Sequence, residues 1–134
     1  MKFKKNTFLI YYMPVVIWAV IIIIVSSLPH PYIIKSSWTK YDKVAHFIEY
    51  GVFGFLLARA LWHKNNNNVT LITIIMSLFI AGVFAGLDEF HQKYIPGRIG
   101  SLDDFMANIS GIIIAHLVYF RYYFWNKIKR NTIP

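Results

Sequence analysis

The chain has 134 residues, of which 57% are hydrophobic and 15% are charged, and its mean hydropathy is +0.47. This composition excludes an ordinary soluble domain, and the length allows one domain at most, so we treat residues 1–134 as a single unit. The absence of cysteine excludes disulfides, thiolate metal sites and a cysteine nucleophile, and the net charge of +8 comes from cations beside apolar stretches, which argues against a nucleic-acid partner.

The first predicted helix covers residues 8–28 and carries no formal charge. About 20 apolar residues cross the hydrocarbon core of a bilayer, so this helix is predicted to be transmembrane. Its basic start is typical of a signal peptide, but its apolar run exceeds the usual signal core of about 7–15 residues and no small-residue cleavage site follows. We therefore expect a retained span, which ends where Pro29 disfavours helix at the preceding residue.

The second predicted helix covers residues 42–62 and is the least ordinary span. It begins at Asp42, which we expect to be its N-cap. Polar residues then recur at spacings of three and four, which places them on one stripe of the helix. The stripe contains Asp42, Lys43, His46, Glu49 and Tyr50. Because Glu49 lies about 10 Å below the start of the helix, within the hydrocarbon, it is expected to face protein, water or a ligand.

The third and fourth predicted helices cover residues 69–92 and 101–124. Glu89 and Gln92 share one face at the end of the third helix. The chain then turns through Pro96-Gly97-Arg98. Ser101 and Asp104 open the fourth helix and match a capping box with Asp in place of the usual Glu or Gln. Asp104 also lies four residues before Asn108, so it is either a helix cap or a member of a polar site, or both.

The charges predict the orientation of the four spans. If both termini lie in the cytoplasm, nine cations fall on the inner side: Lys2, Lys4, Lys5, Arg59, Lys64, Arg121, Lys127, Lys129 and Arg130. The outer side then holds five: Lys35, Lys40, Lys43, Lys93 and Arg98. All six acids also fall in the outer half: Asp42, Glu49, Asp88, Glu89, Asp103 and Asp104. The positive-inside rule therefore favours two cytoplasmic termini and a polar cluster that faces outward.

This topology predicts a binding pocket at the outer face. The second and fourth helices begin there, and their N-termini suit an anion. Lys43 and Arg98 lie beside those starts, above the deeper carboxylates. The ligand class that this arrangement indicates is a membrane lipid with a phosphate-bearing headgroup. The substrate-binding candidates are Asp42, Lys43, Tyr50, Gln92, Arg98, Ser101 and Asn108.

The deeper groups are candidates for acid–base chemistry. The catalytic candidates are His46, Glu49, Glu89 and Asp104. If they converge, burial and neighbouring charges will shift their pKa values, as acid–base roles require. The pairing His46-x-x-Glu49 occurs once, whereas a di-metal helical bundle would show a Glu-x-x-His pairing twice. We therefore predict no protein-held metal and no other cofactor, with a divalent metal between the carboxylates and a phosphate as the alternative.

Several motifs, taken together in their order, resemble the VanZ-like membrane proteins, a family named for a teicoplanin-resistance protein. They are Ser26-Ser27-Leu28-Pro29, Asp42-Lys43-Val44-Ala45-His46-Phe47 with Tyr50 and Gly51, Glu89-x-x-Gln92, Pro96-Gly97-Arg98, and Ser101-x-x-Asp104-x-x-x-Asn108-x-x-Gly111. The resemblance implies about four membrane helices and, in some members, an association with reduced susceptibility to teicoplanin. It covers every candidate residue except Glu49, which rests on the helical-face argument alone.

We therefore predict an all-α integral membrane bundle of four transmembrane helices in the bacterial cytoplasmic membrane. Its expected function is to bind, and in an enzymatic version to modify, a phosphorylated cell-envelope lipid or its precursor. One alternative is a structural or partner-binding protein whose polar cluster only stabilises the bundle. Another is a small ion- or proton-coupled transporter, which would use the same buried acids. The residues leave the oligomeric state open.

Overall fold

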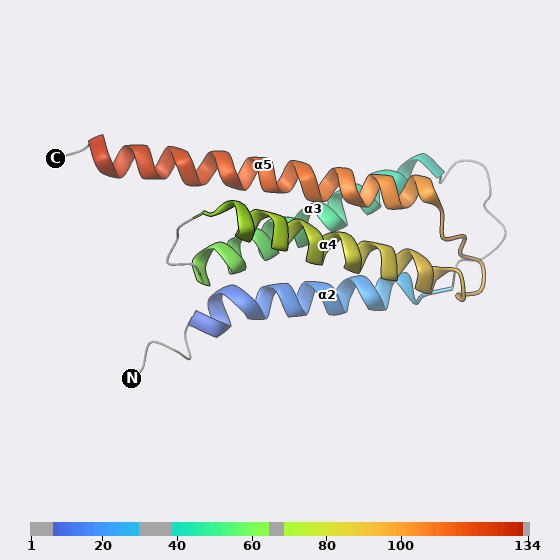
Figure 1. Cartoon of the computed structure of the whole chain (residues 1–134). Helices are drawn as coiled ribbons and strands as arrows, with labels where there is room; N and C mark the ends of the chain where they lie inside the picture. Colours follow the sequence, from blue (N-terminus) through green and yellow to red (C-terminus); the bar gives the residue numbers. More distant parts are fainter. Residues whose placement is uncertain (1–6, 30–38, 65–68, 133–134) are drawn as a thin grey trace.

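The structure is a computed structural model that describes residues 7–29, 39–64 and 69–132 (Figure 1). Its elements are η1 (Phe8–Tyr12, a π-helical turn), α2 (Met13–Ser26), α3 (Thr39–Lys64), α4 (Leu71–Gln92) and α5 (Leu102–Thr132). Because η1 and α2 form one continuous span, four helices are long and apolar enough to cross a membrane. The predicted all-α, four-span fold is therefore confirmed.

The four spans lie side by side and alternate in direction (Figure 1). The start of η1 and the end of α5 lie at one end of the bundle, which we call the terminal end. The end of α4 and the start of α5 lie at the opposite end, which we call the site end. α3 and α5 share the largest interface, whereas α2 buries only Ile22 and Ser26.

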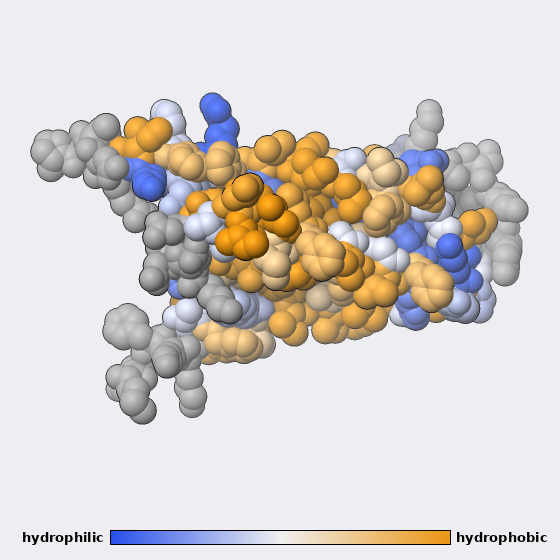
Figure 2. Space-filling model, in the orientation of Figure 1, coloured by the Kyte–Doolittle hydropathy of each residue, from blue (hydrophilic) through white to orange (hydrophobic). Residues whose placement is uncertain are grey.

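The outer surface of the bundle is apolar along most of its length. Figure 2 shows hydrophobic residues over the middle of one face and hydrophilic residues toward the two ends. Large apolar side chains such as Ile24, Phe79 and Leu117 are more than half exposed. Such a surface is stable in lipid and would aggregate in water.

Charge divides between the two ends as the sequence predicts. Of the cations with described side chains, Arg59, Arg121, Lys127 and Lys129 lie on the half nearer the terminal end. All six acids lie toward the site end with Lys43, Lys93 and Arg98. The remaining cations of the sequence count lie outside the described side chains. Which end faces the cytoplasm stays a prediction.

Several helix boundaries differ from those predicted, and three of them have a clear physical reason. α3 begins at Thr39, so the prediction that Asp42 is its N-cap is wrong: Asp42 lies inside the first turn. α4 begins at Leu71 because Thr70 caps it in a capping box with Thr73. α5 continues to Thr132 because no glycine or proline follows Gly111 until the last residue of the chain.

A glycine contact brings α3 and α5 close together. A Cβ atom on Gly111 would overlap the backbone carbonyl oxygen of Phe47, and one on Gly54 would lie 3.1 Å from the Cα atom of Ile112. These are the close backbone approaches that small residues permit in membrane bundles. They bring the polar stripe of α3 against the start of α5.

Candidate functional site

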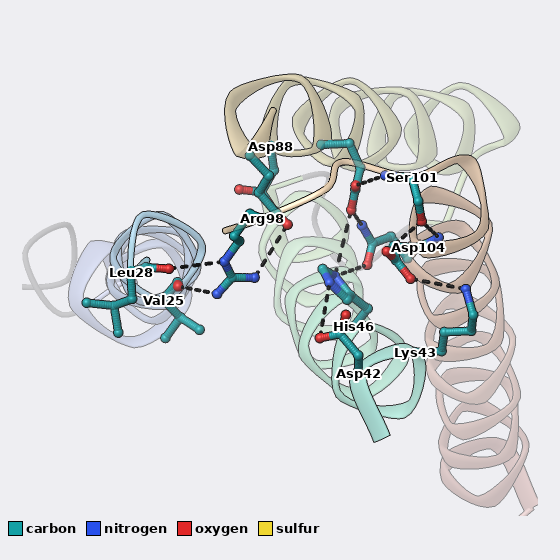
Figure 3. Close-up of polar contacts among 12 residues, drawn as sticks. Val25, Leu28, Asp42, Lys43, His46, Asp88, Arg98, Ser101 and Asp104 are labelled. Atoms are coloured by element: carbon teal, nitrogen blue, oxygen red, sulfur yellow. Dashed lines mark hydrogen bonds and ion pairs between the residues drawn. The ribbon is translucent and has the colours of Figure 1, made fainter. Parts of the chain in front are cut away.

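The polar residues of three helices converge at the site end (Figure 3). His46 of α3, Glu89 of α4 and both Asp104 and Asn108 of α5 are all buried, with at most 9% of each residue exposed. Buried polar groups are costly unless they are hydrogen-bonded, so their partners decide what the cluster can do.

Asn108 joins His46 to Glu89. Its amide nitrogen donates to Glu89 Oε1 at 3.0 Å, and its amide oxygen lies 3.1 Å from His46 Nδ1. Since an amide oxygen only accepts, His46 Nδ1 must carry the proton. In the neutral ring the other nitrogen, Nε2, therefore holds a lone pair. We call these three residues the His46 chain.

The start of α5 is tied to the same chain. The Asp104 amide donates to Ser101 Oγ at 3.1 Å, and the Ser101 hydroxyl donates to Asp104 Oδ2 at 2.5 Å. In the predicted capping box the Ser101 amide would donate to Asp104. Instead it donates to Glu89 Oε2 at 3.2 Å. Asp104 is thus both part of the cap and part of the polar cluster, because its Oδ1 is left for another partner.

That partner is Lys43, at the open edge of the cluster. Its ammonium lies 3.2 Å from Asp104 Oδ1 and 3.1 Å from Asp103 Oδ2. The Lys43 side chain is 42% exposed and that of Asp103 is 79% exposed. Ion pairs this open to the surroundings contribute little to stability and exchange partners readily.

Asp42 completes a group of three around the free nitrogen of His46. Its Oδ1 lies 4.0 Å from His46 Nε2, which is too long for a hydrogen bond. One oxygen of Asp42, one of Asp104 and a ring nitrogen of His46 all lie within 4.8 Å of one another. We call these three residues the Asp42 group.

Arg98 belongs to a separate network between α2 and α4 (Figure 3). Its guanidinium donates to the carbonyl oxygens of Val25 at 2.7 Å and Leu28 at 3.2 Å, and to Gln92 Oε1 at 3.4 Å. Gln92 in turn donates to Asp88 Oδ2 at 2.9 Å. Arg98 therefore satisfies carbonyls at the end of α2, a normal position for a cation. The structure places Arg98 and Lys43 in different networks.

Glu49 and Tyr50 are not joined to either network by a hydrogen bond. Glu49 is half-buried, and its carboxylate acts electrostatically on His46, Asp88 and Arg98 without direct contact in the described part of the chain. The Tyr50 hydroxyl is fully buried, and Asp88 is its polar neighbour, but it has no hydrogen bond of normal geometry to a described residue.

Sequence reasoning missed several polar contacts. Asp88 is not among the predicted site residues, although its spacing of four from Gln92 on α4 is evident in the sequence, and it accepts a hydrogen bond from Gln92. Trp18 donates to the Glu49 carbonyl at 2.9 Å, which holds α2 against α3. Ser77 lies 2.7 Å from His116 Nε2, deep in the bundle. Nothing in the spacing along the chain indicates the last two contacts.

Comparison with known proteins agrees with this architecture. A protein-family model described as VanZ/LLP1 matches residues 6–125, which is most of the chain. No match was found among curated proteins or among solved structures. The matched region includes all four spans of a multi-pass membrane protein and every residue of the polar cluster. The chain therefore belongs to the VanZ/LLP1 family.

Proposed function

We propose that this protein binds a membrane lipid with a phosphate-bearing headgroup at its site end. The observation that carries the proposal is an apolar groove of about 320 Å³ on the face where α3 meets α5. The groove is lined by Phe47, Ile48, Gly51, Val52, Phe55, Gly111, Ile114, Ala115 and Val118. An amphipathic ligand needs such a surface next to a polar one.

The groove lies near the polar cluster along α3 and α5. Phe47 follows Lys43 by four residues on α3, so the groove begins roughly 6 Å from the open edge of the cluster. Ile48 is 57% exposed and Ile114 is 48% exposed, so the groove opens sideways toward lipid. A single lipid can therefore place its headgroup at Lys43 and its chain in the groove without leaving the bilayer.

Lys43 is the cation that supports this binding mode. Its partner Asp103 lies at the surface, so an anionic headgroup can replace that carboxylate at the ammonium. Arg98, in contrast, is engaged by the carbonyls of α2. Among the candidates from the sequence, the proposal therefore assigns the headgroup to Lys43 and to the buried groups beneath it, His46, Asp104 and Asn108.

The proposed lipid is a cell-envelope lipid or its precursor in the outer leaflet of the bacterial cytoplasmic membrane. Support comes from the cations at the terminal end, because the positive-inside rule places the cation-rich end of a membrane bundle in the cytoplasm. The site end then faces outward. A protein that holds such a lipid changes how much of the lipid is accessible at the cell surface. The susceptibility of cells to teicoplanin is therefore a secondary measurement.

The test is native mass spectrometry of the purified protein, which identifies the retained lipid, followed by binding of that lipid to variants. Lys43→Ala removes the cation and Ile48→Trp fills the groove. The matched controls are Lys93→Ala, an exposed lysine of the site end, and Ile75→Trp, a lipid-facing residue of α4 that is 50% exposed. We expect the first two variants to weaken binding by about tenfold or more, equivalent to about 1.4 kcal/mol. The controls should bind as the unaltered protein does.

Equal binding by all four variants would overturn the proposal. Thermal unfolding in detergent separates it from the structural alternative. If Lys43→Ala lowers the melting temperature and leaves lipid retention unchanged, the polar cluster serves the bundle and not a ligand.

A further inference from the structure

We infer that the Asp42 group, made of Asp42, His46 and Asp104, is a binding site for a divalent cation. The three donor atoms come from the first two turns of α3 and the first turn of α5, and all lie within 4.8 Å of one another. One imidazole and two carboxylates form a donor set suited to Zn²⁺ or Mn²⁺. Three protein ligands also leave coordination positions open, as in sites that act on a ligand.

The orientation of His46 is the strongest support. Its Nδ1 is occupied by Asn108, and Asn108 is held by Glu89. Metal-binding histidines normally have their second nitrogen fixed in this way. The residue is only 5% exposed, and within the described residues its Nε2 makes no hydrogen bond. A buried lone pair thus faces Asp42, and a carboxylate oxygen of Asp104 lies within 4.8 Å of a His46 ring nitrogen, so one cation can satisfy all three groups.

The distances fit an ion after a small adjustment. Ligands about 2.1 Å from one ion lie at most about 4.2 Å apart. The 4.0 Å between Asp42 Oδ1 and His46 Nε2 is within that limit. The Asp42 side chain is 42% exposed, so it can rotate toward the ion, whereas Asp104 is held by Ser101. The Lys43 side chain is 42% exposed, so its ammonium can release Asp104 and turn toward the surroundings.

The charges at the site end also favour a cation. Arg98 is occupied by the carbonyls of α2, and Lys43 is shared between Asp103 and Asp104. Within the described part of the chain, neither Asp42 nor Glu89 contacts a lysine or an arginine. The basic side chain near both is His46, at 4.0 Å and 3.8 Å, and it balances a carboxylate only when it is protonated. Carboxylates in poorly solvated positions are costly without a balancing charge.

A bound ion would also give the site a second positive group for a phosphate. This part of the inference rests on the proposed lipid function, whereas the ion site itself does not. A phosphate oxygen is a suitable ligand for the open positions, which lie next to Lys43. The ion would supply a positive charge beside Lys43 that Arg98 cannot supply, because the Arg98 guanidinium is bound to carbonyl oxygens at the end of α2.

The experiment uses the full chain in detergent, first stripped with EDTA. Zn²⁺ and Mn²⁺ are then added separately, and bound metal is measured by elemental analysis and titration calorimetry. We expect about one ion per chain and a higher melting temperature with metal. Asp42→Asn and His46→Ala should weaken ion binding by about tenfold or more. Asp103→Asn, which changes an exposed neighbour outside the donor set, and His91→Ala, an exposed histidine, should not.

The melting temperature in EDTA shows that each variant is folded before its metal affinity is compared. Asp42→Asn is the decisive variant because the only described contact of that side chain is the 4.0 Å approach to His46. Absence of a stoichiometric ion in the unaltered protein, or equal affinity in Asp42→Asn and Asp103→Asn, would overturn the metal site.

Lipid retention in EDTA separates this inference from the proposed function. If lipid binding depends on Lys43 and Ile48 but no ion binds, the metal site fails and the lipid proposal stands. If an ion binds with the expected variant pattern but EDTA does not change lipid retention, the metal site stands and its link to phosphate fails.

Discussion

The described part of the chain contains two buried histidines that differ in how fully they are hydrogen-bonded. His46 is 5% exposed and His116 is 4% exposed. Both nitrogens of His116 have partners, because Nδ1 lies 2.8 Å from the carbonyl oxygen of Ile112 and Nε2 lies 2.7 Å from Ser77 Oγ. Among the residues that the structure describes, His46 has a hydrogen bond on one nitrogen only. Burial alone therefore does not mark a site, whereas an unfilled nitrogen beside carboxylates does.

Their surroundings differ in the same way. His116 adjoins an apolar cavity of about 210 Å³, lined in part by Trp62 and Leu78, and it ties α4 to α5. His46 lies among carboxylates and connects all three helices of the cluster. The bundle therefore separates a stabilising contact nearer the terminal end from the proposed binding region at the site end. Four substitutions test this separation.

The largest expected effect comes from Gly111→Ala, which should disrupt both regions. The added methyl group would overlap the Phe47 carbonyl oxygen, and backbone atoms cannot move aside as a side chain can. We expect a loss of at least about 3 kcal/mol of stability, or failure to obtain a folded bundle. The matched control is Gly82→Ala, where the new Cβ meets a side-chain carbon at an ordinary 3.7 Å. Equal melting temperatures for the two variants would contradict the close approach of α3 and α5.

Arg98→Ala should affect the site end only. It leaves the carbonyls of Val25 and Leu28 without their donor, and we expect it to cost about 1–3 kcal/mol. Arg98→Lys should restore only part of this, since an ammonium cannot reproduce the forked geometry. Thermal unfolding in detergent measures both. Unchanged stability combined with loss of lipid binding would instead make Arg98 a ligand contact.

Ser77→Ala should affect the other region only. The substitution removes the partner of a buried histidine nitrogen, which we expect to cost about 1–2 kcal/mol while metal and lipid binding stay unchanged. Ser110→Ala is the control, because that exposed hydroxyl bonds only to its own helix. A loss of ion binding in Ser77→Ala would show that the two regions are coupled.

Tyr50→Phe should have the smallest effect. It removes a buried hydroxyl that lacks a hydrogen bond of normal geometry and keeps the ring contacts with Phe53 and Phe84. Stability should stay within about 1 kcal/mol of the unaltered protein, or rise slightly. A clear fall in melting temperature would reveal a hydrogen bond to Asp88 or to a bound ligand.

The sequence predicted the fold well because hydrophobic length depends on local residues alone. It also predicted that His46, Glu89, Asp104 and Asn108 would meet, since helical spacing and a common depth are readable from the chain. It placed Glu49 with them as well, but in the described part of the chain no hydrogen bond joins Glu49 to the cluster. The partners of Arg98 were not predictable, because they are backbone carbonyls about 70 positions away. The donation from Ser101 to Glu89 depends on how closely α4 packs against the start of α5, which spacing along one helix does not contain.

The Asp42 group shows the same limit. Asp42 and His46 share a face by their spacing of four, but Asp104 joins them only because Gly111 lets α5 approach α3. The helix start was also misplaced, because the residues from Thr39 to Tyr41 can all be helical and no breaker separates them from Asp42. The sequence pairs His46 with Glu49 on one helix as possible metal ligands. In the structure the donor atoms that lie together belong to Asp42 and His46 on α3 and to Asp104 on α5.

The Arg98 contact has a consequence for the assembly of the protein during synthesis. The first span enters the membrane first, and its contact with Glu49 through Trp18 becomes available after 31 further residues. Its hydrogen bonds at the site end require Arg98, which is 70 positions after Leu28 and 73 positions after Val25. At about 5–20 residues per second, ribosomes need roughly 4–15 s to add that length. The site end of the first helix therefore lacks these hydrogen bonds until the chain beyond the third helix is made, whereas its contacts with α3 become available earlier.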